Sequence, residues 1–135
     1  MKASISFLVL LLSIEAFVNA AVLPQNQQLI EASTNGNIDK VKNILQTSQM
    51  NTVDINNSLI KAVENGHNQI VDVLLQNNAN VNYKDDDDGS TALMWAAHNG
   101  HKETAEILLQ YGAEVNAKND DGNTALIIAA YKGLI

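Results

Sequence analysis

The sequence predicts an all-α fold in which short helix-turn-helix units stack side by side into a solenoid with hairpin-like loops. Two internal matches carry this prediction. The segment Asp88-Gly89-Ser90-Thr91-Ala92-Leu93 returns 33 residues later as Asp121-Gly122-Asn123-Thr124-Ala125-Leu126. The segment Asn65-Gly66-His67 returns 34 residues later as Asn99-Gly100-His101. A fainter copy around Asn35-Gly36-Asn37 lies 30 residues before the second one. Because one such unit cannot bury a core alone, the units must stack.

In the clearest unit, a first helix is predicted over residues 92–99. Thr91 precedes it, and its hydroxyl oxygen can accept a hydrogen bond from a free amide of the first turn. Gly100 follows it, and glycine readily adopts the left-handed conformation that ends many helices. Both ends of this helix are therefore marked by residues suited to cap it.

A second helix is predicted over residues 102–111, because Ala105, Leu108 and Leu109 recur at helical spacing. Gly112 is expected to end it in a left-handed conformation, and Asn78 takes that place in the preceding unit. The following segment, 116–122, is rich in Asn, Asp and Gly, as a hairpin-like connection requires.

These motifs resemble the ankyrin repeat: Asp-Gly-x-Thr-x-Leu, then Ala-Ala, Gly-His, Leu-Leu and Gly-Ala-x-Val-Asn. The resemblance is weak over residues 24–56, good over 57–84, almost complete over 85–118, and covers only the first half of a unit over 119–135. It implies an ankyrin-repeat solenoid over residues 21–135. The last unit is expected to be incomplete, so that its first helix lacks the second helix that would cover it.

The sequence departs from the family pattern in two places. The usual Thr-Pro-Leu-His is Thr91-Ala92-Leu93-Met94 here, so the preset backbone angle of proline and a hydrogen-bonding histidine are both absent. We expect a lower stability than that of an idealised array. Before the second unit, Asn56-Asn57-Ser58 is expected to replace the longer Asp-Gly loop.

Residues 1–20 are predicted to be a signal peptide. Met1-Lys2 begins it, an apolar run extends from Ala3 to Ile14, and Val18-Asn19-Ala20 provides compact residues for cleavage after Ala20. The alternative is an uncleaved or amphipathic N-terminal helix, which Glu15 favours. No later segment is long and apolar enough to span a bilayer. We expect a secreted or periplasmic product.

Composition excludes several functional classes. The 135 residues carry a formal net charge of −7, lysine supplies all 8 basic residues, and there is no arginine. Nucleic acid is therefore an improbable partner. The absence of cysteine excludes disulfides, thiolate catalysis and cysteine-based metal sites. The sequence also contains no serine-histidine-aspartate arrangement and no phosphate-binding loop, so we predict no enzyme, no cofactor and no catalytic residue.

The acidic run of residues 85–88 invites a metal-site interpretation, but its spacing does not match a calcium loop, since Lys84 would hold the first ligand position. A solvated loop tip is favoured over weak cation binding. His98 and His101 are separated by Gly100 and do not share one helix face, so we predict no metal site there either. Trp95 is predicted to pack between units, with exposure as a binding anchor as the alternative.

The resemblance implies that loop tips and the exposed face of the first helices bind a partner. The tips are strongly acidic, which favours a protein with a basic surface. We therefore predict a monomeric, non-enzymatic protein-protein interaction module that is exported and binds, as one candidate, a host protein. The alternative is a remnant of a longer ankyrin-repeat protein with no binding function of its own. The candidate partner-binding residues are Glu64, Asn65, Asp87, Asp88, Ser90, His98, Asn99, Asp120, Asp121, Asn123, Tyr131 and Lys132, and Thr34 and Asn35 occupy matching positions.

Overall fold

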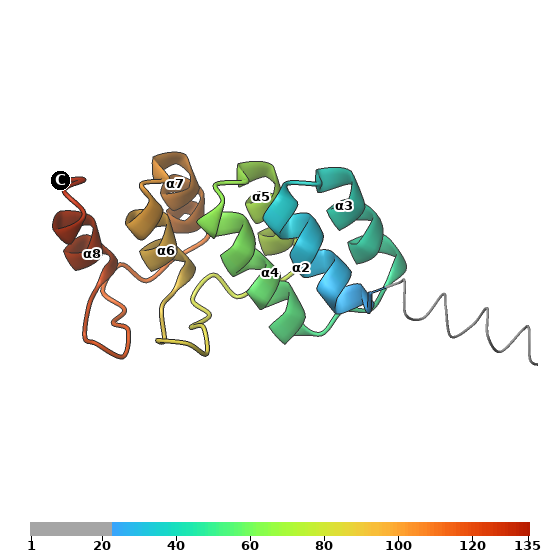
Figure 1. Ribbon diagram of the computed structural model, residues 1–135, viewed down its shortest axis with the longest axis horizontal. Helices are drawn as coiled ribbons and strands as arrows, with labels where there is room; N and C mark the ends of the chain where they lie inside the picture. The colour runs from blue at the N-terminus through green and yellow to red at the C-terminus, as the bar shows by residue number, and fades with distance from the viewer. Residues whose placement is uncertain (1–22) are drawn as a thin grey trace, which may run out of the picture.

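The computed structural model describes residues 23–135, so the predicted signal peptide lies outside the described residues. Over the described range the chain forms seven α-helices and one isolated antiparallel bridge, between Lys84 and Thr91 (Figure 1). The helices are α2 (Gln25–Asn35), α3 (Ile38–Thr47), α4 (Thr52–Glu64), α5 (Asn68–Gln76), α6 (Ala92–Asn99), α7 (Lys102–Gln110) and α8 (Ala125–Tyr131). Within residues 23–135, none of these helices has the length and apolar character needed to cross a membrane.

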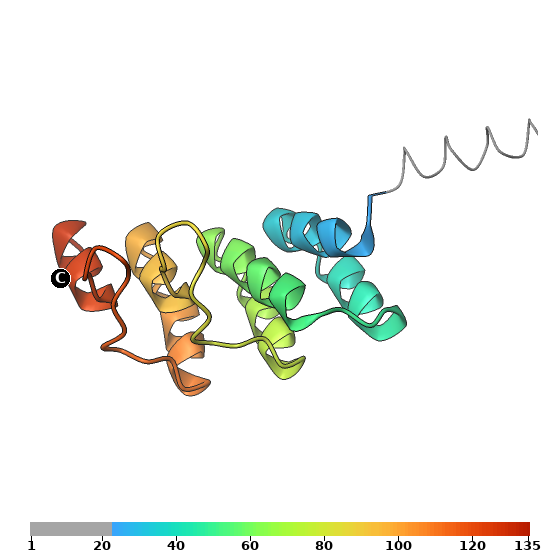
Figure 2. The same ribbon diagram turned by 90° about the horizontal axis from the view of Figure 1, so that it is seen from below.

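The helices form two rows. The first helices of successive units, α2, α4, α6 and α8, pack one on the next, and α3, α5 and α7 form a second row behind them (Figure 2). The buried side chains lie between the rows and between successive units; Leu29, Leu59, Leu74 and Leu108 are fully enclosed. The predicted all-α stack of helix-turn-helix units is confirmed.

The helix ends predicted from the sequence are confirmed in the third unit. The Thr91 hydroxyl oxygen accepts a hydrogen bond from the Met94 amide at 3.4 Å, and Gly100 ends α6 in the left-handed region at φ 69°. Asn78 and Gly112 also lie in that region, at φ 70° and 87°. The Met94 sulfur accepts from the Thr91 amide at 3.4 Å, so methionine contributes a second bond to this cap.

Two histidines join neighbouring units. The Nε2 atom of His67 lies 2.9 Å from the carbonyl oxygen of Thr34, and that of His101 lies 2.9 Å from the carbonyl oxygen of Glu64. Each ring therefore donates to the end of the preceding first helix, as a structural histidine would. The repeat-equivalent residue in the last unit is Leu134, whose side chain offers no hydrogen-bond donor for such a link.

One sequence-based prediction is wrong. Asn56, Asn57 and Ser58 do not form a connection between units but lie inside α4, so the unit boundary placed at residue 57 falls within this helix. Asn51 caps α4 by accepting from the Asp54 amide at 2.8 Å. Burial of apolar residues along α4 outweighs the low helix propensity of the Asn-Asn-Ser segment. Residues 48–51 thus form a short connection, and long loops occur only before α6 and α8.

The close contact between Gly36 and His67 predicts a stability difference between two similar glycines. Gly36 and Gly100 both end a first helix at positive φ, so alanine at either position would cost about 1 kcal/mol in backbone strain. A Cβ atom at Gly36 would lie 2.8 Å from Cε1 of His67, whereas one at Gly100 would lie 3.6 Å from Leu134. We expect Gly36→Ala to destabilise the protein by about 1 kcal/mol more than Gly100→Ala, because it displaces a linking histidine. Urea denaturation followed by circular dichroism measures both losses. Equal losses would show that the histidine moves aside at no cost.

Candidate protein-binding surface

Two hairpin-like loops, residues 77–91 and 111–124, precede α6 and α8 and extend beyond the helix ends (Figure 1). In the first loop, the Asp85 amide donates to the Ser90 carbonyl at 2.9 Å, which closes the tip. The Asp85 carboxylate accepts from the amides of Asp88 and Ser90 at 3.1 and 3.3 Å. It also accepts from the indole N–H of Trp95 at 2.7 Å. One side chain thus ties the loop tip to α6.

These contacts change the acidity of Asp85. Its partial burial disfavours the charged form, but the hydrogen bonds from the Trp95 indole and the amides of Asp88 and Ser90 outweigh that effect. The pKa of Asp85 is therefore lowered below its ordinary value, and the carboxylate stays charged at neutral pH. The acidic tip contains a carboxylate that organises the loop as well as solvated ones.

The second loop repeats this construction with an amide. The side-chain oxygen of Asn119 accepts from the amides of Asp121 and Asn123 at 3.1 and 2.9 Å, as Asp85 does in the first loop. The two loops are also joined directly, because the Asp120 amide donates to the Asp88 carbonyl at 2.9 Å. The tips therefore form one connected wall instead of two independent loops.

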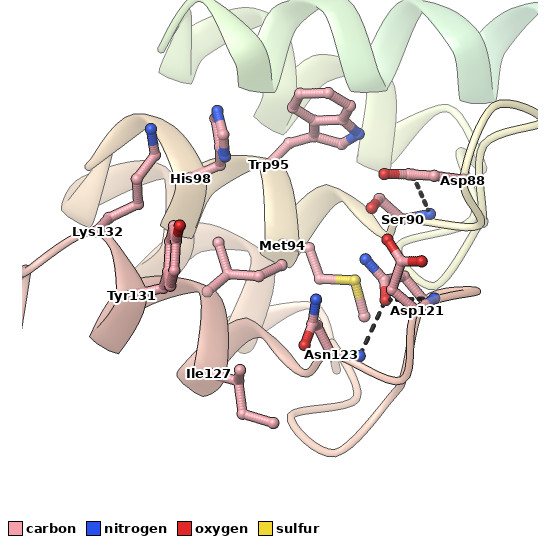
Figure 3. Close-up of a pocket in the computed structure, with 12 residues that line it drawn as sticks. Asp88, Ser90, Met94, Trp95, His98, Asp121, Asn123, Ile127, Tyr131 and Lys132 are labelled. Carbon is pink, nitrogen blue, oxygen red and sulfur yellow. Dashed lines mark hydrogen bonds between the residues drawn. The ribbon is translucent and has the colours of Figure 1, made fainter.

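A pocket with a volume of about 390 Å³ lies between this wall and the helices α6 and α8 (Figure 3). Its size falls in the lower part of the range for ligand pockets in proteins. Apolar side chains from both helices supply one part of the lining, and polar groups from the loops supply the rest. The lining residues are Asp88, Ser90, Met94, Trp95, His98, Asn119, Asp121, Asn123, Ile127, Ile128, Tyr131 and Lys132.

Trp95 has two roles in the structure. Its indole is half-buried and packs against the hydrophobic core, in agreement with the predicted packing between units. It also lines the pocket, with the His98 ring edge-on at a centroid distance of 5.8 Å. The indole N–H is already bound to Asp85, so its orientation is set before any partner arrives.

The structure brings together seven of the twelve predicted partner-binding residues. They come from both loops and from both helices, and all of them line the pocket: Asp88, Ser90, His98, Asp121, Asn123, Tyr131 and Lys132. Ser90 is not at a solvated tip, since it is only 5% exposed. Tyr131, at 92%, is the most exposed large apolar residue of residues 23–135.

The other five predicted residues lie outside the pocket. Asp87 and Asp120 are exposed at the loop tips, and the Asn65 and Asn99 side chains donate to backbone carbonyls within their own helices. The Glu64 carboxylate pairs with the Lys61 amine at 3.1 Å. These residues belong to the same face of the array but do not enclose a volume.

Four pocket residues were not predicted as binding residues: Met94, Asn119, Ile127 and Ile128. The three apolar ones lie on first helices, where the repeat pattern indicates core packing. Met94 is indeed buried, at 1% exposure, while Ile127 is 48% exposed. The available signal was the correspondence of Trp95 with Ile128 at a spacing of 33, which places both on the same helix face.

The pocket is electrically polar. Asp88 and Asp121 lie at the loop end, and Lys132 and His98 lie at the opposite end, near the carboxyl ends of the two helices (Figure 3). Within residues 23–135, no group of three or more His, Asp or Glu side chains is arranged to hold a metal ion. The arrangement is therefore one for recognising shape and charge.

The family described as ankyrin repeats (3 copies) matches the chain over residues 29–119 and again over residues 59–135. The chain belongs to the ankyrin-repeat family. No curated protein matches it. Ankyrin repeats are generally protein-protein interaction modules and are typically non-enzymatic. In this ankyrin-repeat protein, the loops and first helices that form the pocket are the elements of the fold that a partner can reach.

Proposed function

We propose that this ankyrin-repeat array is an exported, monomeric module that binds a protein partner with a basic surface across the third and fourth units. One observation carries the proposal: an apolar pocket bordered by a wall of acidic loop tips. The exposed acids of this wall include Asp86, Asp87, Asp120 and Asp121. Opposite charges on the partner would accelerate its association and would make binding sensitive to salt.

The N-terminal part of the array offers less to such a partner. The first two units are joined by the short connection 48–51, so no acidic loop wall faces α2 and α4. On α4, the exposed charges of Lys61 and Glu64 already pair with each other. The third and fourth units alone combine a loop wall with an apolar helix face.

Neutralising the tips tests this proposal. The tagged chain is used to capture proteins from the extract of a candidate host, beside a variant carrying Asp87→Asn, Asp88→Asn, Asp120→Asn and Asp121→Asn. We expect one protein to be enriched by the unchanged chain, to elute at increased salt, and to be lost with the variant. An enriched protein that binds both chains equally would contradict an acidic binding surface. The double variant Asp39→Asn and Asp72→Asn controls for net charge.

Export rests on residues 1–20, whose pattern supports a signal peptide with cleavage after Ala20. Its test is the mass of the product that a producing cell releases. A product beginning at Ala21 supports export, and an intact chain retained in the cell argues against it.

The alternative, a remnant without a binding function, is favoured by the state of α8. This helix contains no buried residue, and Leu126 remains 66% exposed. Thermal unfolding followed by circular dichroism separates the two. A cooperative transition supports a folded module, whereas a featureless spectrum supports the remnant.

A further inference from the structure

On the basis of the proposed function, we infer that the pocket between α6 and α8 receives an arginine side chain of the partner. The planar guanidinium would lie at the loop end, between the carboxylates of Asp88 and Asp121, and the aliphatic stem would cross the apolar lining. This specifies the chemical group that the pocket recognises, which the acidic surface alone does not.

The apolar lining suits the stem of a long side chain. Met94, Trp95, Ile127 and Ile128 come from two adjacent helices and line one continuous pocket. The repeat-equivalent positions of Trp95 and Ile128 in α2 and α4 are Glu31 and Lys61, so these helices lack the apolar surface. Burial of the methylene groups of an arginine against this lining would add to the attraction of its charge.

The charged end suits a cation. Within residues 23–135, neither Asp88 nor Asp121 takes part in an ion pair. One Asp88 oxygen accepts from the Ser90 amide at 3.0 Å, and its second oxygen has no hydrogen bond of its own. An acidic side chain entering here would meet two carboxylates of its own sign, which excludes an acidic occupant.

Arginine fits better than lysine because its planar group can donate to two acceptors at once and can stack on an aromatic ring. Trp95 presents such a ring, and its N–H bond to Asp85 holds that ring in place. The ammonium of Lys132 and the ring of His98 lie at the other end of the pocket, so charge repulsion directs the guanidinium toward the loop end.

The test uses the fluorescence of Trp95, the single tryptophan of the chain. The probe is a blocked peptide, Ala-Ala-Arg-Ala-Ala, titrated into the full chain beside peptides with citrulline, lysine or glutamate at the central position. We expect saturable binding of the arginine peptide and binding about tenfold weaker for the citrulline peptide, which has nearly the same shape but no charge. Equal binding of the two would overturn the proposal, as would no response to arginine.

Two double variants separate the pocket from the general charge of the tips. Asp88→Asn with Asp121→Asn is expected to weaken binding of the arginine peptide about tenfold. Asp86→Asn with Asp87→Asn removes the same charge from exposed residues of the same acidic run, outside the pocket, and is expected to weaken binding less than twofold. An asparagine at position 88 retains a side-chain oxygen for the Ser90 amide, and circular dichroism checks that both variants fold.

The outcomes distinguish this inference from the proposed function. Equal weakening by the two double variants would overturn the arginine pocket while leaving an acidic binding surface intact. Capture of a partner that resists salt and tip neutralisation would overturn the acidic surface even if the peptide binds. Selective weakening by Asp88→Asn with Asp121→Asn supports the pocket.

Discussion

Leu74→Ala is expected to lower the free energy of unfolding by about 3 kcal/mol, the largest effect that we predict for a single substitution. Leu74 lies in α5, in the second of three complete helix pairs, and its side chain is 0% exposed. Truncation removes apolar contacts on every side and leaves a cavity that the helices of two rows would have to close. In a stacked array such a loss also weakens the interfaces with both neighbouring units.

Leu109→Ala is the matched control. Leu109 has the same side chain and lies in the corresponding second helix of the next unit, but it is 46% exposed. Its truncation is expected to cost less than about 1 kcal/mol. Urea denaturation followed by far-ultraviolet circular dichroism gives both values. Similar losses for the two variants would contradict the stacking of α5 between its neighbours.

Asp85→Ala is expected to lower the free energy of unfolding by about 2 to 3 kcal/mol. The substitution removes three hydrogen bonds, from the Trp95 indole and from two loop amides, each contributing about 1 kcal/mol. Asp85→Asn is expected to cost less than about 1 kcal/mol, because Asn119 makes the corresponding amide contacts in the second loop. The emission of Trp95 reports the local change, and thermal or urea unfolding reports the global one. A loss for Asp85→Asn as large as for Asp85→Ala would contradict the hydrogen-bonding role.

The same carboxylate predicts a pH dependence. The pKa of Asp85 is lower in the folded protein than in the unfolded chain, where it is about 3.9. Its contribution to stability is therefore complete above the unfolded pKa and disappears as the pH falls through the folded pKa. We expect the stability advantage of the unchanged protein over Asp85→Asn to shrink as the pH falls below about 4. An advantage that grows in acid would contradict the direction of the shift.

Short-range features of the fold could be predicted well from the sequence. The bounds of α6, its Thr91 cap and its left-handed Gly100 all follow from residues within a few positions of one another. Asn78 was identified in the same way, from its place after a run of helical residues. These features depend on local backbone sterics and on hydrogen bonds within one turn, so the neighbouring residues carry the information.

The connection before the second unit could not be predicted in this way. Asn56, Asn57 and Ser58 have the composition of a loop, yet they lie inside α4. Asn56 is buried at 6% exposure and accepts from the Asn80 amide at 2.7 Å, a partner 24 residues away. Such a contact appears only when the units have stacked, and it satisfies a polar group that a loop would have left in water.

What the sequence by itself determined is the repeat, its helices and their caps; the tertiary structure decided which repeated residues are buried and where a pocket opens. Leu75 and Leu109 occupy the same position of the same Leu-Leu-Gln motif, yet they are 7% and 46% exposed. The pocket likewise joins Trp95 to residues of the next unit. The physical reason is that burial at a repeat position depends on the unit packed against it. A repeated motif specifies the residue and its helix face, but only the stacked array determines what covers that face.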